Sequence, residues 1–112
     1  MSEIAKIAKL LDRLAELDQE SWKTIVRITT DASKMDENIE DMIIQDTILR
    51  AIVARGWGYD IEYSPLYDGG KYGVTIYHMD VGTTYADPFL EALLAEYVAA
   101  LEYVAMLEAM KK

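Results

Sequence analysis

Hydrophobic residues recur every three or four positions along residues 3–17, which is the spacing of one face of an α-helix. The apolar positions of this helix are Ile4, Ile7, Leu10, Leu11, Leu14 and Leu17. Residues 22–30 carry a mixed pattern, because Trp22, Ile25 and Thr29 continue a helical stripe whereas the run Thr-Ile-Val-Arg-Ile-Thr-Thr favours a strand. No glycine or proline interrupts this stretch, so we favour a helix and keep a strand as the alternative.

A further helix is predicted to begin near Ser33 and to end at Gly56. Ser33 and Asp36 have the spacing of a helix N-cap and its acidic partner. Gly56 is expected to adopt the positive φ that closes many helices, with Trp57 packed against the cap. The predicted buried face consists of Met35, Ile39, Met42, Ile43, Leu49, Ile52 and Val53.

Polar and apolar residues alternate along residues 59–63 and again along residues 72–79, which predicts two antiparallel strands. A turn at Asp80-Val81-Gly82 leads to a third strand at residues 83–86. Asp87-Pro88 has the chemistry of an N-cap followed by a first helical residue. The helix that follows, residues 89–110, contains no glycine or proline.

This last helix is apolar on more than one face, so it is expected to contact both the sheet and another helix, or a second subunit. We favour burial under the first helix and keep a homo-oligomer through the C-terminal helix as the alternative. The sequence thus predicts one α+β domain over residues 1–112, with a small antiparallel sheet of about three strands packed by three to four helices. Residues 1–34 form a helical N-terminal extension, and residues 35–110 form a helix-sheet-helix core.

The charge is strongly acidic and unevenly distributed. The net charge is −9, and residues 35–110 hold fourteen acidic residues against Arg50, Arg55 and Lys71. This balance disfavours direct binding of nucleic acid and favours a partner with a basic surface, although acidity also serves solubility. The chain has no cysteine and no 18-residue uncharged run, so we expect a cytoplasmic protein without a membrane segment.

Two motifs flank the strands: a capping glycine with a tryptophan, and an Asp-Pro helix start that leads into an alanine-rich helix. The residues concerned are Ala54-Arg55-Gly56-Trp57 and Tyr85-Ala86-Asp87-Pro88-Phe89-Leu90-Glu91-Ala92-Leu93. In this order the chain resembles, over residues 40–105, small phage proteins that carry the ABA-sandwich domain. The resemblance implies a phage or prophage accessory protein without a known shared activity. Such proteins are often inhibitors of host defence, which makes an anti-CRISPR-like role an expectation.

Catalytic chemistry has little support in the sequence. His78 and Asp80 share one face if they lie on a strand, and they could act as a base pair or supply two metal ligands. No third ligand and no nucleophile accompany them, and no glycine-rich phosphate loop precedes a helix. We therefore expect no cofactor, no metal and no enzymatic activity.

Tyrosines and carboxylates on and around the strands are the better candidates for a functional surface. Six tyrosines lie between residues 59 and 85 and cannot all enter one core, so some are expected to be exposed. The predicted partner-binding residues are Glu37, Glu40, Asp41, Asp60, Glu62, Tyr63, Tyr67, Asp68 and Tyr77. The favoured function is inhibition of a host defence nucleoprotein through this surface. The alternatives are an oligomer that sequesters a nucleotide-like ligand between aromatic rings, and a domain of unknown function with no enzymatic role.

Overall fold

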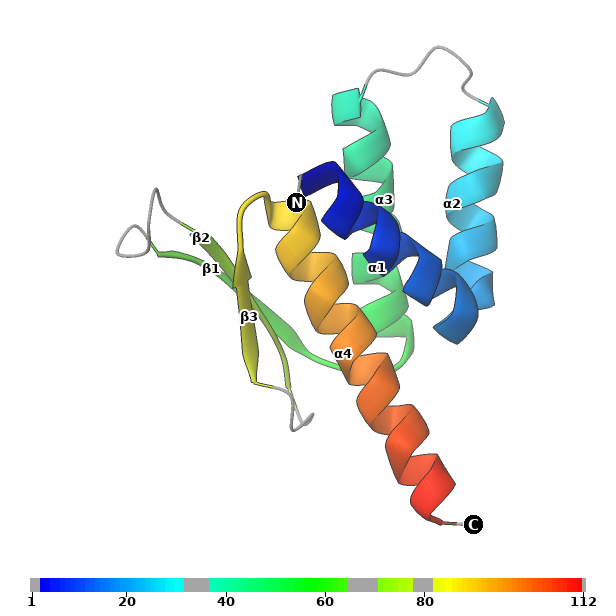
Figure 1. Ribbon diagram of the computed structural model, residues 1–112, viewed down its shortest axis with the longest axis vertical. Coiled ribbons are helices and arrows are strands. Elements are labelled where there is room, and N and C mark those ends of the chain that lie inside the picture. Colours follow the sequence, from blue (N-terminus) through cyan, green and yellow to red (C-terminus); the bar gives the residue numbers. More distant parts are fainter. Residues whose placement is uncertain (1–2, 32–36, 65–70, 78–81, 112) are drawn as a thin grey trace.

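The computed structural model of the chain describes residues 3–31, 37–64, 71–77 and 82–111. It contains, in chain order, α1 (Glu3–Leu17), α2 (Gln19–Asp31), α3 (Glu37–Ala54), β1 (Tyr59–Ser64), β2 (Lys71–Ile76), β3 (Thr83–Ala86) and α4 (Phe89–Met110). The sheet lies on one side of α4, and α1, α2 and α3 lie on the other (Figure 1). The predicted α+β class is therefore confirmed.

The ambiguous segment at residues 22–30 is helical and belongs to α2. Asp18 separates α1 from α2 and caps the second helix, because its carboxylate accepts the Ser21 N–H at 3.2 Å and the Ser21 hydroxyl at 2.7 Å. Once α2 starts at this cap, Ile25 points into the core and is buried. Burial of Ile25 in the core therefore favours the helix over the strand at residues 22–30, where the sequence supports both.

The predicted cap at the end of α3 is confirmed. Gly56 has a φ of 78°. Its N–H donates to the Val53 carbonyl at 2.9 Å, and the Trp57 N–H donates to the Ile52 carbonyl at 3.1 Å. These two bonds form a Schellman motif, which satisfies carbonyl groups that the helix itself leaves open.

The predicted buried face of α3 is wrong in part. The core contacts come from Ile44, Ile48 and Ile52, whereas Ile39, Met42 and Val53 are exposed; Ile43 and Leu49 are half-buried, and Met35 lies outside the described residues. The cause is that α3 carries apolar residues around most of its circumference, so periodicity does not single out one face. Packing against α2 and α4 selects the side that is buried.

The three strands form an antiparallel meander in the order β1-β2-β3. Ile61 pairs with Val74, and Val74 pairs with Thr84. β2 ends at Ile76 rather than at the predicted Met79, which lies outside the described part of the chain. The ladder continues by one bond, because the Tyr77 N–H donates to the Gly58 carbonyl at 2.9 Å.

The helix start at Asp87-Pro88 also differs from the prediction. Pro88 is the N-cap of α4, with φ −82° and ψ 170°, and no side chain caps the helix. Asp87 lies one residue too early to act as the cap. The Asp87–Pro88 peptide bond is cis.

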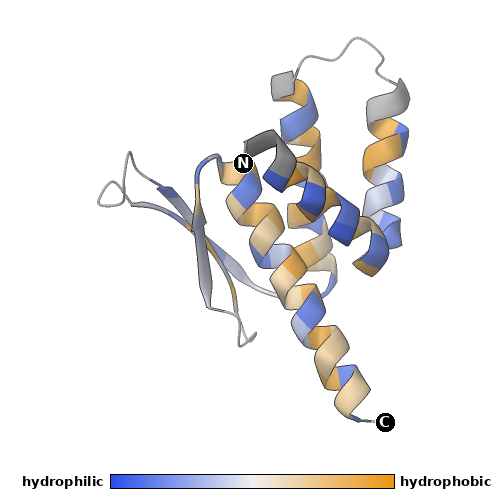
Figure 2. Cartoon of the chain, in the orientation of Figure 1, coloured by the Kyte–Doolittle hydropathy of each residue, from blue (hydrophilic) through white to orange (hydrophobic). Residues whose placement is uncertain are grey.

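α4 is the central element of the fold. Its buried residues contact the sheet on one side and α1 and α3 on the other, as its two apolar faces predicted. Figure 2 shows apolar colouring along most of this helix. The core cluster includes Leu14, Ile25, Ile44, Ile48, Ile52, Val74, Ile76, Leu90, Leu93, Leu94, Tyr97, Val98 and Leu101.

Candidate protein-binding surface

α4 covers one face of the sheet. Val74 and Ile76 of β2 point toward the helix and are buried, and the Tyr72 ring meets the Phe89 ring of α4 with their centroids 5.6 Å apart. Because side chains alternate along a strand, the residues between these three point the other way. This other side, called here the outer face, carries Asp60, Glu62, Lys71, Gly73, Thr75, Tyr77, Thr83 and Tyr85. No helix of the described chain covers it (Figure 1).

The outer face has a defined arrangement at its centre. The Tyr85 ring lies across Gly73, and its hydroxyl donates a hydrogen bond to Glu62 on the far strand. A Cβ at position 73 would lie 2.6 Å from the Tyr85 Cε1 atom, so only glycine admits the ring here. Beside this pair the hydroxyls of Thr75 and Thr83 are hydrogen-bonded at 2.6 Å.

Three of the predicted partner-binding residues share this face. Asp60 and Glu62 point outward, as expected when Ile61 takes the opposite direction. Tyr77 lies beside Gly58, and 45% of its surface is exposed. The structure therefore brings two carboxylates and a tyrosine of the prediction onto one open surface.

Of the remaining predicted residues, those that the structure describes do not join this surface. Tyr63 belongs to the opposite face, where its ring lies 5.1 Å from that of Tyr72. Glu40 and Asp41 are exposed on the first turns of α3, which lies on the other side of α4 from the sheet (Figure 1). Tyr67 and Asp68 lie outside the described residues, and so does the side chain of Glu37.

Sequence reasoning gives no functional role to Tyr85 and Gly73, which lie at the centre of the outer face. The sequence predicts Tyr85 only as a residue of the third strand, whereas its hydroxyl donates a hydrogen bond to Glu62. A signal was present in the sequence, because a glycine inside a strand commonly marks the close approach of another group. The identity of that group depends on the register between β2 and β3, which the sequence leaves open.

A buried carboxylate fastens the sheet to α4. Glu96 accepts the Ile76 N–H at 2.8 Å and the Thr84 hydroxyl at 2.8 Å, and its side chain has no contact with solvent. Burial raises the pKa of Glu96, and the two hydrogen bonds oppose that rise only in part. Its role is structural, because both of its partners belong to the sheet that it supports.

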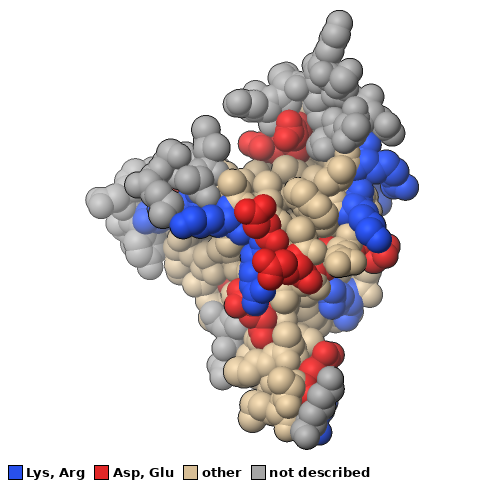
Figure 3. Space-filling view, turned by 45° about the vertical axis from the view of Figure 1, so that its right-hand side comes forward, with Lys and Arg blue, Asp and Glu red and all other residues tan. Residues whose placement is uncertain are grey.

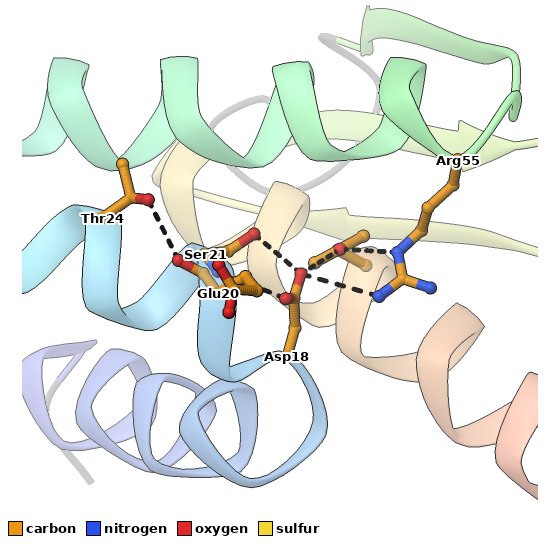
Figure 4. A network of polar contacts seen from close by, with 6 residues as sticks. Asp18, Glu20, Ser21, Thr24 and Arg55 are labelled. Carbon is orange, nitrogen blue, oxygen red and sulfur yellow. Dashed lines mark hydrogen bonds and ion pairs between the residues drawn. The ribbon is translucent and has the colours of Figure 1, made fainter.

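A second polar network joins the helices (Figure 4). The Tyr97 hydroxyl donates to Asp18 at 2.5 Å and accepts the Arg55 Nε–H at 3.1 Å. The Arg55 guanidinium lies 3.8 Å from the Asp18 carboxylate and 5.2 Å from the centroid of the Trp57 ring. This network ties the α1–α2 junction and the end of α3 to the middle of α4.

The network shifts two pKa values in opposite directions. Burial alone would raise the pKa of Asp18, but hydrogen bonds from Tyr97 and Ser21, with the charge of Arg55, lower it below its usual value. Burial and the hydrogen bond to Asp18 raise the pKa of Tyr97 to about 12. Tyr97 therefore stays protonated at physiological pH and is fully buried, which suits a structural link and not an acid or base in contact with substrate.

The described residues offer little for cofactor or metal chemistry. No group of three potential metal ligands occurs among them, and His78 and Asp80 lie outside the described part of the chain. Two hollows of about 430 and 450 Å³ share Asp46, Arg50 and Ala54 of α3 in their linings. Their linings contain one aromatic side chain, that of Tyr59, so neither hollow presents a pair of rings for a flat ligand.

Charge is mixed on the helical side of the molecule. Figure 3 shows acidic and basic side chains close together over the helices, and the lower end, formed by the end of α4, carries acidic side chains along its right-hand edge. No described helix combines the length and apolarity needed to cross a membrane.

No family model matches the chain, and comparisons with curated proteins and with solved structures return no match either. The resemblance to phage ABA-sandwich proteins therefore stays a prediction.

Proposed function

We propose that this protein is a binding protein, not an enzyme, and that the outer face of its sheet recognises a basic surface on a protein partner. The observation that carries the proposal is the open sheet face, on which Asp60, Glu62, Tyr77 and Tyr85 lie together. Carboxylates at such a face attract a basic partner over a distance, and tyrosines supply contact area after the encounter.

The centre of the outer face is ordered before a partner arrives. Tyr85 is held over Gly73 by its bond to Glu62, so its ring loses little conformational freedom on binding. Asp60 makes no ion pair or side-chain hydrogen bond with any residue the structure describes, and it is exposed. A cationic side chain of the partner would find a carboxylate there without displacing an internal one.

A host defence nucleoprotein is the partner class that we propose. Such a complex carries a basic groove for nucleic acid, and the acidic surface of this chain offers carboxylates in place of phosphates. The net charge of −9 supports this assignment, as does the resemblance to phage accessory proteins. The same assignment places the protein in the host cytoplasm, where these nucleoproteins work.

Two double variants that remove the same charge from opposite sides of α4 test the proposal. D60N/E62Q removes two carboxylates from the outer face, and E40Q/D41N removes two from α3. Binding to purified CRISPR effector ribonucleoproteins is measured by calorimetry at low and high salt. We expect D60N/E62Q to weaken binding by about tenfold or more, equivalent to ~1.4 kcal/mol, and E40Q/D41N to leave it nearly unchanged.

Circular dichroism of both variants confirms that the fold is kept. Equal affinity of D60N/E62Q and the wild type would refute the role of the outer face. An absence of binding to every ribonucleoprotein tested would refute the partner class, and the outer face would then be tested with other basic proteins.

A further inference from the structure

β1 is an edge strand that the helices leave open. It pairs with β2 on one side, and no strand of the described chain pairs with its other side, called here the free edge. α4 packs mainly on β2 and β3. The four central residues of β1, residues 60–63, are all exposed, although they alternate between the two faces of the sheet. A partner can therefore reach the free edge and both faces of this strand.

The hydrogen-bond pattern shows which backbone groups point to the free edge. In an antiparallel pair, opposite residues alternate between pairs that exchange both backbone bonds and pairs that exchange none. The Tyr77 N–H donates to the Gly58 carbonyl, so in this register the even-numbered residues of β1 bond to β2. The residues whose N–H and C=O groups point away from β2 are Tyr59, Ile61 and Tyr63.

A second observation supports this assignment. Ile76 lies opposite Tyr59 and gives its N–H to Glu96 on the far side of β2, not to β1. No hydrogen bond to the outward groups of Tyr59, Ile61 and Tyr63 occurs among the described residues. A row of unpaired N–H and C=O groups is the template for one more strand.

The side chains of β1 specify what such a strand must carry. Asp60 and Glu62 point to the outer face, and on an added antiparallel strand the residues opposite them approach to about 4.5 Å between Cα atoms. Lysine or arginine at these two positions would pair with both carboxylates. The residue between them would lie opposite Ile61, which points to the other face and is 40% exposed, so an apolar side chain fits there.

Tyr63 takes part through its backbone alone. Its ring lies 5.1 Å from the ring of Tyr72 on β2, which turns it away from the free edge. The contacts of an added strand on this face therefore come from Ile61.

A second copy of β1 does not meet these requirements. Antiparallel pairing of β1 with itself is centred on one residue, because odd-numbered residues of both copies must bond. Centring on Ile61 sets Asp60 opposite Glu62 twice, and centring on either carboxylate sets that carboxylate opposite itself. Like charges directly opposite each other destabilise a pair of strands, so the free edge fits a basic strand of another protein.

We propose that an extended segment of the partner, in which basic and apolar residues alternate, adds to the free edge of β1 as an antiparallel strand. The proposal rests on the proposed function, since it names how a basic partner meets the carboxylates of the outer face. Backbone bonds at Tyr59, Ile61 and Tyr63 supply affinity, and the pairs with Asp60 and Glu62 supply specificity.

Amide hydrogen exchange, followed by NMR, tests the position of the added strand. In the free protein the amides of Tyr59, Ile61 and Tyr63 should exchange much faster than those of Asp60 and Glu62, which bond to β2. The probe is the peptide Ser-Val-Lys-Val-Lys-Val-Ser, and about 1 mM of it should slow the three fast amides threefold or more. Three amides that are slow without peptide, or unchanged with it, would overturn the proposal.

Methyl groups on the peptide backbone test the hydrogen bonds. In the antiparallel arrangement the valine N–H groups face β1 and the lysine N–H groups face away. N-methylation of the central valine should weaken binding at least about tenfold, and N-methylation of one lysine, the matched control, should leave it within about threefold. Equal affinity of the two methylated peptides would overturn strand addition. A loss confined to the methylated lysine would overturn the antiparallel direction.

Charge is tested with the same peptide. Glutamate in place of both lysines should weaken binding at least about tenfold, and D60N/E62Q should bind the lysine peptide about threefold to tenfold more weakly than the wild type. E40Q/D41N is the control and should stay within about twofold. Equal affinity for the lysine and glutamate peptides would overturn the requirement for a basic strand. No ribonucleoprotein is present here, so peptide binding by a protein that binds no ribonucleoprotein would support strand addition and refute the partner class alone.

Discussion

Tyr85 reaches across the sheet to donate a hydrogen bond to Glu62, and Gly73 between them leaves the space for its ring. A tyrosine of one outer strand thereby fixes a carboxylate of the other. The pair connects all three strands on the face that we assign to partner binding. Stability and recognition are therefore linked at Gly73.

The first prediction concerns that glycine. In Gly73→Ala the new Cβ would lie 2.6 Å from the Tyr85 ring, so the ring must move and its bond to Glu62 breaks. We expect a loss of about 1–3 kcal/mol in the free energy of unfolding, measured by urea denaturation. In the Tyr85→Ala background the same alanine should cost much less, because the ring is absent. An equal cost in both backgrounds would show that the ring is not what position 73 accommodates.

The second prediction concerns the buried Glu96. Its pKa is raised in the folded protein, so its stabilising effect is complete below the unfolded pKa of about 4.3 and is lost as pH rises through the folded pKa. Glu96→Gln can still accept the Ile76 N–H through its oxygen and can donate its amide to Thr84. In this variant the free energy of unfolding should no longer fall over that pH window. At pH ~8 it should equal or exceed that of the wild type.

Glu96→Ala is the control for this second prediction. It leaves the buried Ile76 N–H without its acceptor and should cost about 2–3 kcal/mol below pH ~4.3, and this cost relative to the wild type should shrink as pH rises through the folded pKa of Glu96. Chemical denaturation of the three proteins across the pH range measures both effects. The wild-type free energy of unfolding, minus that of Glu96→Gln, should fall as pH rises above ~4.3. A difference that does not fall would contradict the raised pKa of Glu96.

The third prediction concerns the network around Asp18. Its pKa is lowered in the folded state, so its contribution is present above the unfolded pKa of about 3.9 and is lost as pH falls through the folded pKa. Tyr97→Phe removes the hydroxyl that bonds Asp18 and Arg55, and should cost about 1–2 kcal/mol at neutral pH. This cost should shrink in acid, where Asp18 becomes protonated. Thermal unfolding at pH ~7 and pH ~3 measures the difference, and a cost independent of pH would exclude the coupling.

Much of the fold is predictable because its boundaries depend on local chemistry. Gly56 ends α3 through its positive φ, and the alternation along β1 and β2 gives the strands and their pairing direction. The exposed side of α3 is not predictable in this way. Its apolar residues surround the helix, and the positions of α2 and α4 decide that Ile48 is buried and Val53 exposed.

The candidate site is predictable in composition but not in geometry. The surplus of tyrosine and carboxylate on the strands is visible in the sequence, yet the residues divide between two faces of the sheet and a distant helix. The alternation of side chains along a strand correctly predicts that Asp60 and Ile61 point to opposite faces of the sheet. The role of Tyr85 depends on the register between β2 and β3, which pairs it with Gly73 and is set by the whole sheet.

The fourth prediction separates the two faces of the sheet by one kind of substitution. Tyr63 and Tyr77 are exposed to similar extents, 55% and 45%, but Tyr63 points to the α4 side and Tyr77 to the outer face. If the outer face binds the partner, Tyr77→Ala should weaken binding by about tenfold, since tyrosine is enriched among the interface residues whose truncation costs more than ~1 kcal/mol. Tyr63→Ala should change the affinity by less than about twofold. Calorimetry with the same ribonucleoprotein measures both variants, and a larger loss for Tyr63→Ala would move the binding surface to the opposite side of β1.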